Sequence, residues 1–247
     1  MSELKGKKAL VTGGSRGIGA SIALALAEHG ADVAITYHQS ADRAAEVVRT
    51  IQTKGQRGAS IKADSADSAA VLRSVEEAVR ALGGLDILVN NVGTARLGKF
   101  VEQSLADIDA ILNTNIRATV LASQAAIPHL GRGGRIITIG SNAAERSPFP
   151  GLAVYALSKS ALMGFTRHLA RELGPQGITV NLVQPGPTDT ELNPDNSSEL
   201  AIMNRRLTAL DRYASPAEIA AVTAFLAGPA SSYMTGSIVT VDGGYNA

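Results

Sequence analysis

The chain has 247 residues, of which 45% are hydrophobic and 18% charged, and its formal net charge at pH 7 is only +1. A chain of this length can bury a substantial core, while the near-neutral charge gives no electrostatic reason to expect a nucleic acid or a membrane as partner. The absence of cysteine excludes disulfides and thiolate metal sites, and the four histidines stand at no metal-ligand spacing, so we expect no metal.

Short apolar runs alternate along the chain with longer amphipathic segments. Strands are predicted over 7–12, 32–37, 58–63, 86–89, 134–139, 178–183 and 237–241. Helices are predicted over 17–29, 41–54, 67–82, 106–128, 154–173 and 216–228. This alternation implies right-handed βαβ units and a parallel sheet buried on both faces. The sequence therefore predicts an α/β fold in a single domain, 1–247, with a doubly wound parallel sheet of about seven strands.

A glycine-rich loop joins the first predicted strand to the first predicted helix. Gly13, Gly17 and Gly19 follow the spacing G-x-x-x-G-x-G, which differs from the G-x-G-x-x-G dinucleotide fingerprint. Glycine permits positive φ and lets backbone amides approach a ligand closely. The helix that follows begins with free N–H groups and the positive end of its dipole, so the loop is suited to a pyrophosphate.

Polar residues follow the later strands at their carboxyl ends, which is where ligands bind to open α/β sheets. They are Asp64 and Ser65 after the third strand, Asn90, Asn91 and Gly93 after the fourth, Ser141 and Asn142 after the fifth, and Pro185 and Gly186 after the sixth. All of them should therefore converge on one edge of the sheet, where a dinucleotide can lie.

Tyr155 and Lys159 are four residues apart in a predicted helix, so they share one helical face. A free tyrosine, with a pKa of ~10, is ineffective as a base near neutrality. An adjacent ammonium stabilises the phenolate, and we expect Lys159 to lower the pKa of Tyr155 into a working range. Taken alone, the pair is equally consistent with an exposed tyrosine beside a solvated lysine.

The least regular stretch of the chain is roughly 184–214, which is rich in proline, asparagine and serine. A long irregular insert in a compact domain is usually a functional loop. We therefore predict a substrate loop or lid at about 188–212.

Together these motifs resemble the short-chain dehydrogenase/reductase family from Lys7 to Gly244. The resemblance rests on Thr12-Gly13-x-x-x-Gly17-x-Gly19, Asp64, Asn90-Asn91-x-Gly93, Asn115, Ser141, Tyr155-x-x-x-Lys159, Pro185-Gly186 and Val241-Asp242-Gly243-Gly244. Each motif is modest alone, but their order and spacing make the set specific. The resemblance implies a Rossmann fold that binds a nicotinamide dinucleotide.

The resemblance also implies catalytic roles for four residues. Tyr155 would protonate a substrate carbonyl during reduction, or act as the base in the reverse direction. Ser141 would donate a hydrogen bond to the same oxygen, which stabilises the charge that develops there. Lys159 would lower the pKa of Tyr155 and hold the ribose hydroxyls, and Asn115 would support a water chain leading to the lysine.

Two of these residues have alternative interpretations, and the chain departs from the family in two places. Asn115 could simply cap or kink its helix, and Ser141 could be a helix N-cap. Val92 stands where the family usually has alanine and could shift its loop. The interval from Ser141 to Tyr155 is one residue longer than in many members, so the loop 143–151 should change the shape of the substrate site.

The cofactor prediction depends on the end of the second strand, where no carboxylate occurs before Asp42. An acidic residue there would bind a ribose 2′-hydroxyl and repel a 2′-phosphate. Arg16 can offer a fork of donors to a phosphate, with Arg43 in the next helix, so we expect NADP(H) rather than NAD(H). Alternatively, Arg16 merely solvates its loop. The predicted cofactor-binding residues are Gly13, Ser15, Arg16, Gly17, Ile18, Gly19, Tyr37, His38, Ser40, Asp64, Ser65, Asn91, Gly93, Tyr155, Lys159, Pro185, Gly186 and Thr188.

The leading functional hypothesis from the resemblance is an NADPH-dependent carbonyl reductase acting on a small carbonyl or alcohol substrate. A 3-oxoacyl-[acyl-carrier-protein] reductase is one alternative, although basic residues are sparse at 128–134 and 174–177. The other is a cyclic-di-GMP-binding regulator, because the segment 184–190 resembles the biofilm dispersal mediators. The predicted substrate pocket comprises Thr94, Ala95, Arg96, Asn142, Phe149, Leu152 and parts of 189–210, and Arg96 could pair with an anionic substrate.

The remaining expectations concern location and assembly. The N-terminal segment lacks an apolar signal region and no apolar run reaches membrane length, so we expect a cytoplasmic protein. The resemblance implies a homotetramer, with contacts near 106–128 and 154–173 and at the last helix and strand. Ala118, Ala122 and Ala126 would allow close packing there, although they would equally suit contact with the sheet.

Overall fold

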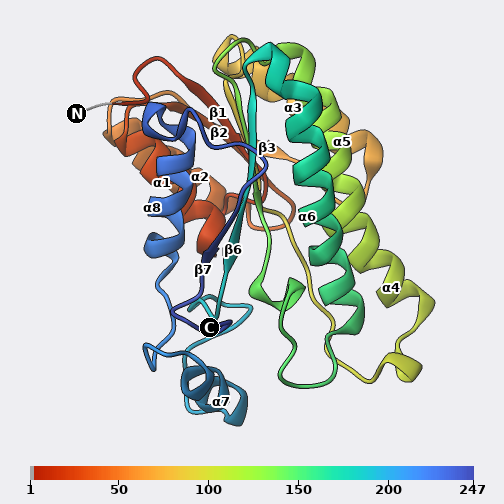
Figure 1. Cartoon of the computed structure of the whole chain (residues 1–247). Helices are drawn as coiled ribbons and strands as arrows, with labels where there is room; N and C mark the ends of the chain where they lie inside the picture. The colour runs from red at the N-terminus through yellow and green to blue at the C-terminus, as the bar shows by residue number, and fades with distance from the viewer. Residues whose placement is uncertain (1–2) are drawn as a thin grey trace.

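The computed structural model describes residues 3–247 as one parallel sheet between two layers of helices (Figure 1). The first two residues of the predicted domain lie outside the described residues. The strands are β1 Lys8–Val11, β2 Asp32–Tyr37, β3 Gly58–Lys62, β4 Ile87–Asn90, β5 Arg135–Ile139, β6 Thr179–Pro185 and β7 Ile238–Val241. They form a seven-stranded sheet in the order β3-β2-β1-β4-β5-β6-β7. The predicted doubly wound α/β fold is confirmed.

The helices divide between the two faces of the sheet (Figure 1). One face carries α1 Gly17–Glu28, α2 Ala41–Thr53 and α8 Pro216–Ala227, and the other carries α3 Ser68–Leu82, α4 Leu105–Leu112, α5 Ala118–Ala126 and α6 Ala153–Leu173. Two apolar clusters fill the two interfaces, and neighbouring residues of one strand serve opposite clusters. Val11 packs with α1 and α8, whereas Leu10 packs with α3 and α5. This alternation is why the strands read as continuous apolar runs.

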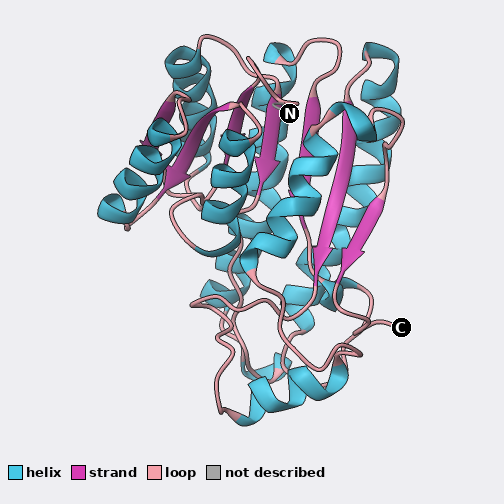
Figure 2. Ribbon diagram, turned by 90° about the vertical axis from the view of Figure 1, so that its left-hand side faces the viewer, coloured by secondary structure: helices cyan, strands magenta, loops and turns pink. Residues whose placement is uncertain are grey.

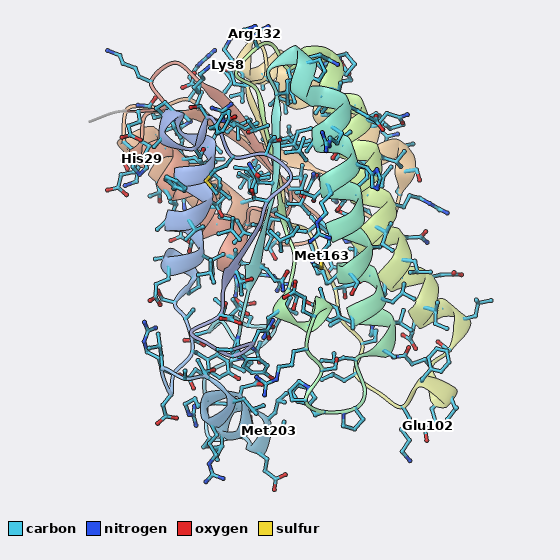
Figure 3. The ribbon with its side chains drawn as sticks, viewed as in Figure 1. Lys8, His29, Glu102, Arg132, Met163 and Met203 are labelled. Carbon is cyan, nitrogen blue, oxygen red and sulfur yellow. The ribbon has the colours of Figure 1, made fainter. Side chains whose placement is uncertain are left out.

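All strands end at the same edge of the sheet, where the loops gather (Figure 2). Val11 is in register with Ile35 of β2 and with Val89 of β4, so the loops after these three strands meet at one level. Figure 3 shows Lys8 and Arg132 at the opposite edge, far from Met203 in the loop region. The strand order reverses at β1, so the loops that follow β1 and β4 diverge and leave room for a ligand between them.

The predicted helix 106–128 is present, but it contains a π-helical turn that the sequence did not reveal. A π-helical turn, Asn113–Arg117, separates α4 from α5. Asn115, in that turn, is fully buried, and its side chain bonds to residues of other elements. The backbone stays in the right-handed helical region at both ends of this turn, so periodicity along the chain could not reveal it.

The predicted lid contains a helix that the sequence did not reveal, α7 Glu199–Leu207. Ser198 caps it by accepting a hydrogen bond from the Ala201 N–H. The helix is short and lies apart from the two main layers, at the loop edge (Figure 2). It therefore extends one wall of the region into which the strands point.

Two further expectations concern surfaces and membranes. Ala118, Ala122 and Ala126 are buried in the cluster with β4 and β5, so of their two interpretations the structure supports contact with the sheet. Within residues 3–247, no helix combines the length and the apolar composition that crossing a bilayer requires.

Candidate active site

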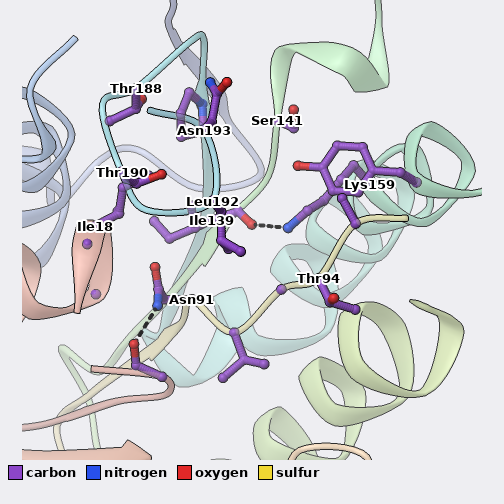
Figure 4. Close-up of a pocket in the computed structure, with 18 of the residues that line it drawn as sticks. Ile18, Asn91, Thr94, Ile139, Ser141, Lys159, Thr188, Thr190, Leu192 and Asn193 are labelled. Carbon is purple, nitrogen blue, oxygen red and sulfur yellow. Dashed lines mark hydrogen bonds between the residues drawn. The ribbon is translucent and has the colours of Figure 1, made fainter. Parts of the chain in front are cut away.

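A cleft of about 760 Å³ opens at the carboxyl edge of the sheet (Figure 4). Every residue predicted to bind the cofactor lines it, as do the predicted catalytic residues Ser141, Tyr155 and Lys159. Two of the predicted residues do not line it, namely Asn115 and Asn90, and the buried side chain of Asn90 donates a hydrogen bond to the Ser123 Oγ instead. The other polar residues that follow the strands all line the cleft, so they converge on one edge of the sheet as predicted.

The glycine-rich loop forms one wall of the cleft and packs tightly against the loop that follows β4. Gly13 and Gly17 have φ of 66° and 54°, where any side chain would be strained. A Cβ at Gly13 would lie 2.8 Å from Cγ2 of Val92, so the valine fills the space beside the loop. Asn91 fixes the contact by donating from Nδ2 to the carbonyl oxygens of Thr12 and Gly13, at 3.0 and 3.1 Å (Figure 4).

The start of α1 faces the same cleft and is suited to an anion. The helix has no acidic residue in its first turn, and no side chain caps its first N–H groups. These N–H groups and the helix dipole favour a bound phosphate. The backbone geometry thus fits the pyrophosphate of a dinucleotide, as the glycine spacing predicts.

Two arginines and a histidine lie at the far end of the cleft, where the second strand ends. Arg16, from the glycine loop, lines the cleft, whereas Arg43, in the first turn of α2, is not among the lining residues and contacts Glu191, which is. Both donate hydrogen bonds to the side chain of Glu191, so Arg16 is ion-paired in the structure, and its contact with a phosphate stays a prediction. His38 lies 3.7 Å from Asp64, measured from Nε2 to Oδ2. This donor set fits a dinucleotide that carries a 2′-phosphate.

Lys159 is buried at the opposite end of the cleft, with only 4% of its surface exposed. Its ammonium donates a hydrogen bond of 3.0 Å to the carbonyl oxygen of Ile139 (Figure 4). Burial lowers the pKa of Lys159 to about 8. A Cβ at Gly93 would lie 3.3 Å from its Nζ, so glycine at that position leaves the ammonium its space.

The structure reverses the expected pKa shift of Tyr155. Burial raises the pKa of the phenol above its usual value, and interaction with the Ser141 hydroxyl only partly offsets this rise. The ammonium of Lys159 lies 5.9 Å from the centroid of the Tyr155 ring and is directed to Ile139. Desolvation is the largest effect on the phenol, so the net shift is upward, and a lowering of this pKa by Lys159 stays a prediction. The phenol is protonated near neutral pH.

Ser141 serves as a helix cap and also faces the cleft. Its Oγ accepts a hydrogen bond of 3.2 Å from the Ala143 N–H, at the start of a 3-10 turn over Asn142–Ala144. One lone pair of the hydroxyl is thereby engaged, while its hydrogen stays available. The two predictions for this residue, as a cap and as a donor, are thus compatible.

Asn115 links the loop after β4 to the helix that carries the tyrosine. Its Oδ1 accepts from the Thr94 N–H at 2.8 Å, and its Nδ2 donates to the Thr94 carbonyl oxygen and the Ser158 Oγ, both at 2.9 Å. Ser158 in turn donates to the carbonyl oxygen of Tyr155 at 2.7 Å. Asn115 thus makes these contacts from inside a π-helical turn and caps no helix end, and its part in a water chain stays a prediction.

The rest of the cleft has apolar and polar walls where a substrate could lie. All six single residues predicted for this pocket line it, namely Thr94, Ala95, Arg96, Asn142, Phe149 and Leu152. Arg96 lies 3.6 Å from Asp107, so a carboxylate of the protein already neutralises it. Sequence reasoning missed Tyr245, which is buried and lines the pocket beneath Arg146. The positive φ of Gly243 and Gly244 turns the chain end back to this wall.

Comparison with known proteins identifies a matching family and relatives that align with nearly the whole chain. The chain matches the family model described as Enoyl-(Acyl carrier protein) reductase over residues 13–246. It is 44% identical, over the full length of both chains, to the cyclic-di-GMP-binding biofilm dispersal mediator protein of Escherichia coli. It is 40% identical to the hydroxynaphthalene reductase-like protein Arp2 of Metarhizium robertsii, with 98% of this chain and 95% of the relative covered.

Among solved structures, one similar protein is a short-chain dehydrogenase from Burkholderia cenocepacia in complex with NADP. The TM-score is 0.97 and the identity 53%, and the match covers 99% of this chain and 100% of the other. The match therefore spans nearly the whole of both chains.

Proposed function

The chain belongs to the short-chain dehydrogenase/reductase family, and we propose that it is an NADPH-dependent reductase of a small carbonyl compound. The family consists of NAD(P)-dependent oxidoreductases, and a similar structure holds NADP. The observation that carries the proposal is the placement of Ser141, Tyr155 and Lys159 together on one wall of the cleft. The glycine loop and Arg16 on the other walls supply the groups that a dinucleotide phosphate requires.

The proposed chemistry assigns one task to each residue. When bound, the reduced nicotinamide supplies the hydride to the carbonyl carbon. Tyr155 donates its phenolic proton to the carbonyl oxygen, and the raised pKa keeps that proton in place near neutral pH. Ser141 donates a second hydrogen bond to the same oxygen, and the positive charge of Lys159 stabilises the phenolate that remains. Lys159 also holds the ribose hydroxyls.

The test is consumption of NADPH over a panel of ketones, aldehydes and one 3-oxoacyl thioester, with Tyr155→Phe as the control. We expect at least one carbonyl to be reduced by the wild type, and the variant to lose that activity while still binding NADPH. Failure of every carbonyl, or full activity in the variant, would contradict the proposal. Reduction of the thioester alone would favour the acyl-carrier-protein alternative.

The regulator alternative has one supporting observation, the name of the relative that is 44% identical. The sequence feature that suggested it, the segment beginning at Gln184, is less informative in the structure. The Gln184 side chain is fully buried and does not line the cleft, although Pro185, Gly186 and Pro187 do. Titration calorimetry with cyclic-di-GMP, with and without NADPH, would distinguish the two functions. Tight binding without any carbonyl turnover would favour the regulator.

We also propose that the protein assembles as a homotetramer in the cytoplasm, as the resemblance implies. Exposed apolar side chains on α4 and α6 support the first contact, since Leu105 and Leu157 are 73% and 57% exposed. Phe225 on α8, at 45% exposed, lies on the element of the second contact. Size-exclusion chromatography with light scattering tests this, and a monomeric mass would contradict it.

A further inference from the structure

The segment 188–193, here called the strap, lies across the cleft at the start of the predicted lid. Thr188 is buried, lines the cleft, and donates a hydrogen bond of 3.0 Å from its hydroxyl to the carbonyl oxygen of Gly186. Thr190 lies beside the first turn of α1, where a Cβ at Gly17 would be 3.4 Å from its Cγ2. Glu191, the next residue, forms ion pairs with Arg16 and Arg43. The strap therefore passes over the position of the pyrophosphate.

Glu191 holds the strap to the rim of the cleft through two arginines from different elements. Its Oε2 lies 3.0 Å from Nη1 of Arg16, and its Oε1 accepts a hydrogen bond from Nη1 of Arg43. The hydrogen bond from Arg43, followed by the effects of Arg16, lowers the pKa of Glu191 below its usual value. The carboxylate is therefore ionised near neutral pH and bridges two guanidinium groups.

The two arginines are also the groups in this part of the cleft that best suit a 2′-phosphate. A carboxylate and a phosphate offer the same kind of acceptor to an arginine fork, so they compete for the same donors. They also repel each other when both are close, because both are negative. An NAD(H) molecule has a neutral 2′-hydroxyl in place of the phosphate, so it does not compete with Glu191 for the two arginines.

We propose that Glu191 is a determinant of cofactor selectivity, which occupies Arg16 and Arg43 in place of the 2′-phosphate and must be displaced when NADP(H) binds. This inference rests on the proposed function, because it takes NADP(H) as the ligand. Displacement frees the strap at one end, so binding of the phosphate and opening of the strap are coupled. Displacement of Glu191 does not increase the affinity for NAD(H), because NAD(H) has no 2′-phosphate to bind the arginines.

We expect Glu191 to have a modest effect on the affinity for NADPH, because its ion pairs with Arg16 and Arg43 are exposed to solvent. Arg16, Arg43 and Glu191 each have about half of their side-chain surface in solvent, at 50–51%. Exposed ion pairs contribute little individually, so removing the competition should tighten binding by about threefold to tenfold. High salt should reduce this gain, because it screens exposed charges.

The experiment measures the dissociation constants of NADPH and NADH for the wild type, Glu191→Gln and Glu199→Gln at low salt. Glu199 is a matched control, since it is an exposed glutamate in the same lid. We expect Glu191→Gln to bind NADPH about threefold to tenfold more tightly. Its affinity for NADH should stay within about twofold, and Glu199→Gln should resemble the wild type. The gain should disappear when Arg16 and Arg43 are both replaced by glutamine.

Several outcomes would overturn this inference. Unchanged or weaker NADPH binding by Glu191→Gln would show that the carboxylate does not compete with the phosphate. Equal tightening for both cofactors, or the same gain in Glu199→Gln, would indicate a general charge effect. These results would leave the proposed reductase intact if the wild type binds NADPH. If the wild type binds neither cofactor, the proposed function and this inference both fail.

Discussion

The burial of Lys159 predicts that its replacement by methionine makes the folded protein more stable. Methionine has a similar length and no charge. A fall in pKa from 10.5 to about 8 means that the fold disfavours the charged form, by on the order of 3 kcal/mol at neutral pH. The substitution also removes the hydrogen bond to the Ile139 carbonyl oxygen, which costs about 1–2 kcal/mol. We therefore expect a net gain of about 1–2 kcal/mol at pH 7.

The pH dependence gives this prediction a defined sign. Below about pH 8 the lysine is charged in both the folded and the unfolded state, so the full penalty of burial is present. Between about pH 8 and 10.5 the unfolded state holds more protons, so the stability of the wild type rises with pH. The advantage of Lys159→Met should therefore shrink across this range, and at the upper end the lost hydrogen bond should make the variant the less stable protein.

The assay is urea unfolding followed by circular dichroism at pH 7 and at about pH 9.5, without cofactor. Lys99→Met is the control, since the Lys99 side chain is 78% exposed and its replacement should change stability little at either pH. A Lys159→Met protein that is less stable than the wild type at pH 7, or a difference that does not change with pH, would refute the reasoning. The variant should also lose reductase activity, which would show that the site retains the lysine for function at a cost in stability.

Three further predictions concern the tyrosine, the phosphate end and the helix interruption. Because burial raises the pKa of Tyr155, the rate of carbonyl reduction should stay constant through neutral pH and decline in the alkaline range. The rate of alcohol oxidation should rise in that alkaline range. A reduction rate that falls between about pH 6 and 8 would contradict this prediction. Arg16→Gln should raise the dissociation constant of NADPH about tenfold and leave that of NADH within about twofold, as titration calorimetry can measure, and equal losses would argue against a phosphate contact. Asn115→Ala should lower the free energy of unfolding by about 2–4 kcal/mol, because it removes three hydrogen bonds and leaves the backbone N–H and carbonyl oxygen of Thr94 without this partner, and an unchanged urea midpoint would count against the proposed link.

Much of the fold is encoded locally and could be predicted from the sequence. Apolar runs separated by amphipathic segments give the strands and helices, and parallel strands must end at one edge. The glycine loop and the polar residues after the strands therefore had to meet, wherever the helices packed. The double-sided burial of the sheet follows from the same runs, as Leu10 and Val11 show by facing opposite layers.

What the sequence could not give depends on partners far apart in the chain. The interruption at Asn115 depends on Thr94 and Ser158, which are 21 and 43 residues away. The carboxylate of Glu191 meets Arg16 and Arg43 across 175 and 148 residues. No local pattern marks such contacts, because the side chains meet only after the sheet has brought their loops to one edge.

The direction of the Tyr155 pKa shift shows most clearly the difference between what the local sequence predicts and what the tertiary structure decides. The spacing of Tyr155 and Lys159 along one helix is a local property, and it predicts an ammonium near a phenol. How much water each group retains is set by β5, the loop after β4 and the helix together, and that burial raises one pKa and lowers the other. The sequence by itself determined which groups meet in the cleft, whereas tertiary packing decided the direction in which their pKa values shift, because desolvation depends on everything that surrounds them.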